Sequence, residues 1–137
     1  MKNLLLVKAP LDHKEALVDK WYMPIDLLTI GDIAEKEGAF VKILDGTIRE
    51  IDFILNQDFS AFSIVGISYT AFSSRYAGMI AKKAKESGCY VIFGGQAASG
   101  AANMLIKSNH VDAIVVGDGE PAIKALVHVN DFTESEL

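Results

Sequence analysis

Residues 62–95 read FSIVGISYTAFSSRYAGMIAKKAKESGCYVIFGG, and this stretch decides the fold class. Residues 62–68 and 90–93 are apolar runs of strand length. Between them, residues 74–87 are predicted to form a long helix that ends at Gly88, a residue type typical of helix caps. A strand, a helix and a second strand in this order predict a right-handed crossover between parallel strands.

The same alternation of strand and helix runs through the chain. The predicted strands are residues 2–8, 40–44, 62–68, 90–93 and 113–116. The predicted helices are residues 24–37, 48–56, 74–87, 100–107 and 120–128. The third and fifth strands are apolar without alternation, as strands covered on both faces should be. Five such units predict an α/β, flavodoxin-like (Rossmann-like) domain: a five-stranded parallel sheet of order 2-1-3-4-5 with helices on both faces.

Length and composition narrow the function classes. The 137 residues suit one domain at residues 1–129, and the polar, acidic residues 130–137 are expected to begin a linker to an absent catalytic domain. No apolar run approaches the roughly 20 residues of a bilayer span, and no signal peptide opens the chain, so we expect a cytoplasmic protein without membrane contact. A net charge of −5 without a basic stripe argues against nucleic acid. The single cysteine, Cys89, is expected to be a buried structural thiol.

Ligands of such sheets bind at the carboxyl ends of the strands, beside the switch point between the first and third strands. The loop after the first predicted strand, residues 9–23, exceeds the usual length of about two to six residues. The loop at residues 68–74 is rich in hydroxyl groups, and glycines open residues 94–100 and 117–120. Either glycine stretch alone predicts only a tight turn. Together with the hydroxyl loop on the same edge, they indicate a groove for a bulky ligand.

Three other ligands of this fold do not fit these loops. A phospho-receiver needs an acidic pair after the first strand and an aspartate after the third, whereas Ala9-Pro10 and Ser68 stand there. A flavin site needs a phosphate loop of hydroxyls and glycines after the first strand, and a dinucleotide site needs GxGxxG there. Neither is present, so Asp45 at the end of the second strand is expected to be a turn or cap residue.

At these loops the sequence resembles the cobalamin-binding domain of the class B, cobalamin-dependent radical S-adenosylmethionine enzymes. The matching pieces are KNLLLVKAP at 2–10, PIDLL at 24–28, VGISYT at 65–70, VIFGGQ at 91–96 and VDAIVVGDGEP at 111–121. They cover nearly the whole chain, and the last piece is the most specific. Three positions depart from the family pattern: Asp26 and Gln96, where the family often has glycine and histidine, and Asp118, where glutamate is commoner.

The resemblance implies which loops would bind the cofactor. The loop at Ser68 and Thr70 would meet the nucleotide tail of cobalamin, and Gly94 would let that tail run into the sheet edge. The first loop would lie against the corrin, while the loop after the fifth strand would close the tail pocket. The implied cofactor-binding residues are Pro10, Leu11, Ser68, Tyr69, Thr70, Phe72, Gly94, Gly95, Gln96, Gly117, Gly119 and Glu120.

The cobalt is expected to have no histidine ligand. Cobalamin domains of the methionine-synthase type carry DxHxxG after the first strand, which supplies the lower imidazole ligand. Here Asp12 and His13 are adjacent, and the glycine of that motif is missing. An exposed loop histidine is the better interpretation of His13, because the aspartate must be spaced to reach the second ring nitrogen. The resemblance therefore implies base-off cobalamin.

The expected function is that of the N-terminal module of a cobalamin-dependent radical S-adenosylmethionine enzyme, such as a methyltransferase or cyclase. The chain lacks the CxxxCxxC of such enzymes and is not expected to be catalytic alone. The 4Fe–4S cluster and S-adenosylmethionine would belong to the absent domain, in cis or in trans. Two alternatives stay open: a stand-alone corrinoid carrier, and a degenerate domain that only docks its partner domain.

Overall fold

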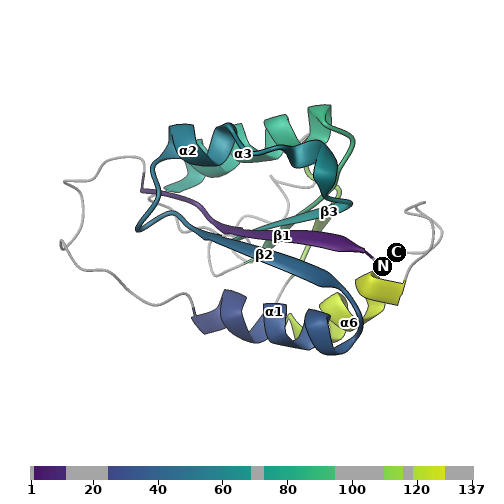
Figure 1. Cartoon of the computed structure of the whole chain (residues 1–137). Helices are drawn as coiled ribbons and strands as arrows, with labels where there is room; N and C mark the ends of the chain where they lie inside the picture. Colours follow the sequence, from purple (N-terminus) through teal and green to yellow (C-terminus); the bar gives the residue numbers. More distant parts are fainter. Residues whose placement is uncertain (1, 12–24, 69–72, 95–109, 116–118, 129–137) are drawn as a thin grey trace.

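A computed structural model describes residues 2–11, 25–68, 73–94, 110–115 and 119–128 (Figure 1). The elements in chain order are β1 (Asn3–Lys8), α1 (Ile25–Lys36), β2 (Phe40–Asp45), α2 (Ile51–Leu55), the 3-10 helix η2 (Phe59–Ala61), β3 (Ile64–Ser68), α3 (Ser74–Glu86), β4 (Tyr90–Gly94), β5 (Ala113–Ile114) and α6 (Glu120–His128). The predicted helix at 100–107 and the predicted linker at 130–137 lie outside the described residues.

The five strands form one sheet in the order β2-β1-β3-β4-β5, and every pairing is parallel. This confirms the predicted order. β1 and β3 lie inside the sheet with helices packed over both of their faces, which explains why their sequences are almost continuously apolar. Leu4, Leu5, Val7, Ile64 and Val65 in these two strands are fully buried.

Helices cover both faces of the sheet, with α2 and α3 on one side and α1 and α6 on the other (Figure 1). We name these sides the α2/α3 face and the α1/α6 face. The α2/α3 face buries Val7, Ile67, Val91 and Phe93 under Ile54, Ala77, Ile80, Ala81 and Ala84. The α1/α6 face buries Leu4, Leu6, Ile64 and Ile92 under Leu27, Ala34, Ile123, Leu126 and Val127. Alternate residues of each strand therefore pack into two separate cores, one on each face of the sheet.

Glycines end α1 and α3, as their sequences predict. Gly38 and Gly88 have φ values of 100° and 87°, a region that side chains other than glycine rarely adopt. The amide of Gly38 donates to the carbonyl of Glu35, and the next amide donates to Ala34, so the last carbonyls of α1 are satisfied. Each glycine turns the chain directly into the following strand.

The helix predicted at residues 48–56 starts later in the structure, and α2 is only Ile51–Leu55. The reason is a turn built on Asp45, whose Oδ1 accepts hydrogen bonds from the amide and hydroxyl of Thr47 at 2.9 and 2.6 Å. Its carbonyl also accepts from the amides of Ile48 and Arg49. The turn confirms the predicted role of Asp45, and Ile48, which lies in the turn and not in a helix, is 63% exposed.

Cys89 is a structural thiol, as its place at the start of a buried strand predicts. It is 1% exposed, and its Sγ donates to the carbonyls of Phe59 and Phe62. Burial raises the pKa of the thiol, which keeps it protonated. The thiol therefore ties η2 to the start of β4.

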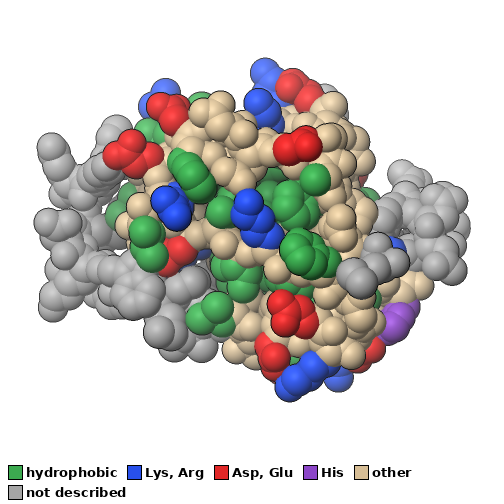
Figure 2. All heavy atoms as spheres, in the orientation of Figure 1, with side chains coloured by type: hydrophobic (Ala, Val, Ile, Leu, Met, Phe, Trp, Pro, Cys, Tyr) green, Lys and Arg blue, Asp and Glu red, His purple; other side chains and the backbone are tan. Residues whose placement is uncertain are grey.

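The outer surface mixes apolar and charged side chains over the view in Figure 2. Phe40 on the edge strand β2 and Phe53 on α2 are 55% and 40% exposed, and the guanidinium of Arg49 stacks over the Phe53 ring at 4.5 Å. Among the described residues, no helix has the length and apolar character needed to cross a membrane.

Candidate functional site

The last fully paired row of the sheet runs across its carboxyl edge. In register, Asp45 of β2 pairs with Lys8 of β1, Lys8 with Ser68 of β3, and Ser68 with Gly94 of β4. Two of these residues, Ser68 and Gly94, are predicted cofactor-binding residues. The parallel register therefore brings the ends of the third and fourth strands side by side, beside the switch point between β1 and β3.

All four residues of this edge row face the helices α1 and α6. Successive side chains of a strand point to opposite faces, and the preceding residues Val7, Ile67 and Phe93 pack into the α2/α3 core. Lys8 and Ser68 therefore lie on the α1/α6 face, on the side of Leu6 and Ile92. They are half-buried, whereas Val7, Ile67 and Phe93 are at most 3% exposed.

The α1/α6 face of β3 and β4 carries very small side chains near the carboxyl edge. Gly66 lies in a central strand and is still partly accessible to solvent. A Cβ placed on Gly94 would meet none of the described atoms within 4 Å, whereas one placed on Gly66 would meet the Cδ2 of Leu6 at 2.9 Å. Among the described residues, the backbone of this face is therefore more approachable at Gly94 than at Gly66.

The chain leaves β1 in a fixed direction toward the same edge. The amide of Ala9 donates to the carbonyl of Ser68 at 3.0 Å, so β1 stays paired to β3 one residue beyond its end. Gly46 packs against the exit, and a Cβ there would lie 2.3 Å from the Lys8 carbonyl oxygen and 2.4 Å from the Pro10 nitrogen. Pro10 is buried and Leu11 half-buried at this exit.

The start of α6 lies close against α1. A Cβ on Gly119 would approach the Cδ1 of Ile30 to 2.9 Å, so only glycine fits without moving that side chain. Glu120 follows as the first residue of α6, and it is exposed. A carboxylate in a first helical turn is favourable there because of the amide dipoles. α1 follows β1 and α6 follows β5 in the chain, so each helix begins toward the carboxyl edge and runs back toward the amino edge of the sheet.

The structure brings half of the predicted site residues to this edge. Those described are Pro10, Leu11, Ser68, Gly94, Gly119 and Glu120. Those outside the described residues are Tyr69, Thr70, Phe72, Gly95, Gln96 and Gly117. The departures at Gln96 and Asp118 and the loop histidine His13 are likewise outside them.

Sequence reasoning missed Lys8, Gly46 and Gly66. Lys8 is the cation of the edge row, and its signal was a charged residue closing an otherwise apolar strand. Gly66 was visible as a glycine inside a central apolar strand, which often marks a close approach. Gly46 gave no signal beyond a turn residue, because its contact with Pro10 depends on the pairing of β1 with β2.

Within the described part of the chain, no group of three or more His, Cys, Asp or Glu side chains could hold a metal ion. No family model, curated protein or solved structure matches this chain. The site must therefore be interpreted from its own residues: a half-buried row of small and polar groups on one face of a parallel sheet.

Proposed function

We propose that this chain binds cobalamin in the base-off form, as the N-terminal module of a radical S-adenosylmethionine enzyme of the methyltransferase or cyclase type. The observation that carries the proposal is the α1/α6 face at the carboxyl edge, where Gly66, Ser68 and Gly94 present small surfaces on adjacent strands. The sequence resemblance supplies the identity of the ligand, and the geometry supports a long ligand entering at this edge.

The nucleotide tail of base-off cobalamin is a suitable occupant of such a surface. It is a narrow chain that carries a phosphodiester and ends in a flat heterocycle. Glycine at the strand end lets the tail approach backbone atoms, and the hydroxyl of Ser68 can donate to phosphate or ribose oxygens. Lys8 adds a positive charge in the same row, beside Ser68. These residues fit the tail, and the exit of β1 at Pro10 would then lie toward the corrin.

Two of the three histidines, His110 and His128, lie among the described residues. His128 pairs with Glu37 at 2.8 Å, where α6 and α1 end, at the amino edge of the sheet. His110 precedes β5 and lies toward the same edge. Neither is placed at the carboxyl edge where the edge row lies.

Cobalamin uptake tests the proposal. The protein should be incubated with hydroxocobalamin, desalted and examined by its visible spectrum, which should show retained corrinoid in about equimolar amount, as expected for one site. Absence of corrinoid after desalting would contradict the proposal and favour a domain that only docks its partner. His13 should not be a ligand of the cobalt. Any nitrogen coupling in the electron paramagnetic resonance spectrum of the cob(II)alamin form should therefore remain in His13→Ala, and its loss in this variant would contradict the proposal.

A pair of glycine variants places the ligand. Gly94→Leu should abolish corrinoid retention, because the side chain would occupy open volume at the end of β4. Gly78→Leu is the matched control, since Gly78 is exposed on α3 and a Cβ there also meets none of the described atoms within 4 Å. The control should retain cobalamin like the parent. Equal retention by both variants would contradict the placement of the tail at Gly94.

A further inference from the structure

The fifth strand is too short to fix its own register. β5 comprises Ala113–Ile114, and its ladder with β4 consists of two pairs, Ile92↔Ala113 and Phe93↔Ile114. Among the described residues, two further backbone hydrogen bonds join these strands: the amide of Asp112 donates to the carbonyl of Val91 and the amide of Val115 to that of Phe93, at 2.9 Å each. Longer strands fix their register through many pairs and a long hydrophobic pattern, which two residues do not provide.

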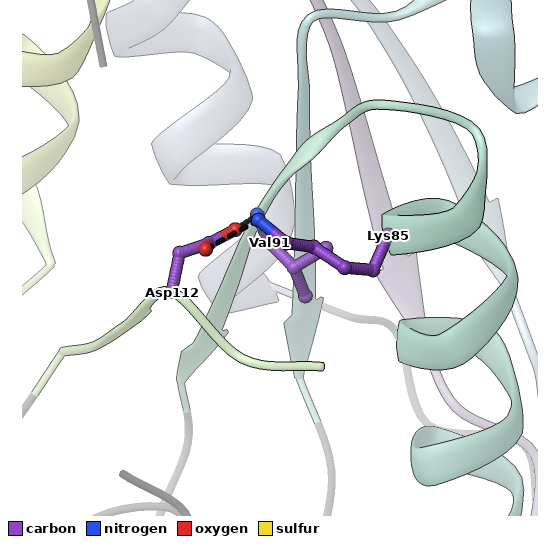
Figure 3. Close-up of polar contacts among 3 residues, drawn as sticks. All are labelled: Lys85, Val91 and Asp112. Carbon is purple, nitrogen blue, oxygen red and sulfur yellow. Dashed lines mark hydrogen bonds and ion pairs between the residues drawn. The ribbon is translucent and has the colours of Figure 1, made fainter. Parts of the chain in front are cut away.

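Asp112 supplies the missing constraint with its side chain (Figure 3). Its Oδ2 accepts the amide of Val91 at 2.8 Å, while its own amide donates to the Val91 carbonyl. One residue therefore binds both backbone groups that Val91 turns toward β5. Val91 is fully buried, so its amide would be left without an acceptor, at a cost in free energy, if the carboxylate moved away.

Lys85 holds the second oxygen of the same carboxylate. It lies in the last turn of α3 and forms an ion pair with Oδ1 of Asp112 (Figure 3). The Asp112 side chain is 20% exposed and that of Lys85 39%, so the carboxylate is mostly enclosed and the ammonium group is partly solvated. The carboxylate thus links α3, β4 and the start of β5.

A slip of β5 by one residue would break more than this carboxylate contact. Ala113 and Val115 pack with the α1/α6 core, whereas Val111 and Ile114 pack with the α2/α3 core. Moving the strand by one position would exchange the two sets between faces. The Asp112 carboxylate and this apolar pattern therefore favour the same register for the segment.

The register of β5 also sets which residue of this segment lies beside the end of β4 at the carboxyl edge. Beyond Val115 the chain returns at Gly119, which packs against Ile30 of α1 and starts α6. The described residues on the two sides of this connection are thus held separately: Val115 follows β5, whose register involves Asp112, and Gly119 packs against α1. The amide of Val115 donates to Phe93, so the end of β5 lies beside Gly94, one of the proposed tail contacts.

We propose that Asp112 is a positioning residue for the cobalamin site: by fixing β5 against β4 from the amino edge, it places the end of β5 at Val115 beside Gly94 at the carboxyl edge. This inference rests on the proposed function. It assigns to Asp112 no contact with the ligand, and it makes Val91, not Lys85, the essential partner. The ion pair contributes less because Lys85 is more than one third exposed and is screened by water.

Three variants separate these contributions. Asp112→Ala removes both interactions and should weaken hydroxocobalamin binding by about tenfold or more, the effect expected when a buried amide loses its acceptor. Asp112→Asn keeps an oxygen for the Val91 amide, and Lys85→Met removes only the ion pair. Both should bind hydroxocobalamin within about threefold of the parent, the size of an exposed-pair effect.

Asp58→Ala is the control for general loss of stability. Asp58 also accepts a backbone amide, that of Ser60 at 3.2 Å, but it caps η2 far along the chain from β5. This variant should lower the thermal midpoint without changing hydroxocobalamin affinity. If Asp112→Ala fails to fold, Asp112→Glu replaces it, because the longer side chain displaces β5 and should also weaken binding.

Hydrogen exchange without cobalamin separates this inference from the proposed function. The amide of Val115, which donates to Phe93, should exchange about tenfold faster in Asp112→Ala than in the parent, since opening of β5 becomes easier. Unchanged exchange, or unchanged hydroxocobalamin affinity in Asp112→Ala, would overturn the positioning role. A parent that binds no hydroxocobalamin but shows the faster exchange in the variant would overturn the proposed function and leave the register role of Asp112 standing.

Discussion

The two faces of the sheet differ most at its carboxyl edge. On the α2/α3 face, Val7, Ile67 and Phe93 fill the space under the helices and are at most 3% exposed. On the α1/α6 face, the very next residues Lys8, Ser68 and Gly94 are half-buried and small or polar. Since the same three strands supply both sets, the difference cannot come from their position in the sheet. One face contributes stability, and the other keeps space at the edge where ligands of this architecture bind.

The amino edge shows no such difference between the faces. Cys89 packs with the α2/α3 core and the adjacent Tyr90 with the α1/α6 core, and they are 1% and 8% exposed. Both faces are closed at the start of β4. The half-buried residues Ser68 and Gly94 at the carboxyl edge of the α1/α6 face are therefore not matched at the other end of β4.

The largest expected effect separates two neighbouring residues of β4. Phe93→Ala should reduce the free energy of unfolding by about 3–5 kcal/mol, because it leaves a cavity in the α2/α3 core. Gly94→Leu should change it by less than about 1 kcal/mol, since the new side chain enters open space. Urea denaturation of both variants measures the difference. A similar loss of stability in both variants would contradict the conclusion that the α2/α3 face contributes stability while the α1/α6 face leaves space at the carboxyl edge.

The next effect concerns the exit of β1. Gly46→Ala should destabilise the fold by about 1–3 kcal/mol or more, because its Cβ would press on the backbone at Lys8 and Pro10, which cannot rotate away. Gly66→Ala is the comparison: its Cβ would meet only the Cδ2 of Leu6, at 2.9 Å, and that methyl group can shift. The thermal midpoint of Gly46→Ala should therefore be well below that of Gly66→Ala. The reverse order would be inconsistent with the packing of Gly46 against Pro10.

The smallest effect is a pH dependence at the closed amino edge. Burial raises the pKa of the Cys89 thiol above its ordinary value of 9.0, and the Lys85 charge opposes this shift less strongly. Burial and, second, the Asp112 carboxylate raise the pKa of Tyr90. Because the unfolded chain releases these protons first, the stability they contribute is complete below pH about 9 and is lost as the pH rises through the folded pKa values.

The thermal midpoint should therefore fall as the pH rises above about 9, and Cys89→Ala should show a shallower fall because one of the two titrations is gone. Differential scanning fluorimetry across this range is sufficient. A midpoint that stays level or rises with pH in the parent would show that these two groups are not protected at the amino edge.

The sequence was sufficient for the sheet order and the helix ends, because each depends on local patterns: apolar strands between helices, and glycines such as Gly38 and Gly88 after them. It was not sufficient at Ile48, where the Asp45 turn prevented the helix that the apolar spacing predicted. The edge row also could not be predicted residue by residue. Pairing of Lys8 with Ser68 requires the register between strands that are distant in the chain, and a strand pattern alone does not fix it.

The account is tested most directly by following backbone amides during a titration with hydroxocobalamin. In a two-dimensional ¹H–¹⁵N spectrum, the resonances of Ser68, Gly94 and Gly119 should shift or broaden as the cofactor is added. Those of Ser63 and Asp112 at the opposite edge should move much less. Shifts concentrated at the amino edge or on β2, or a spectrum unchanged by excess cofactor, would contradict a cobalamin site on the α1/α6 face.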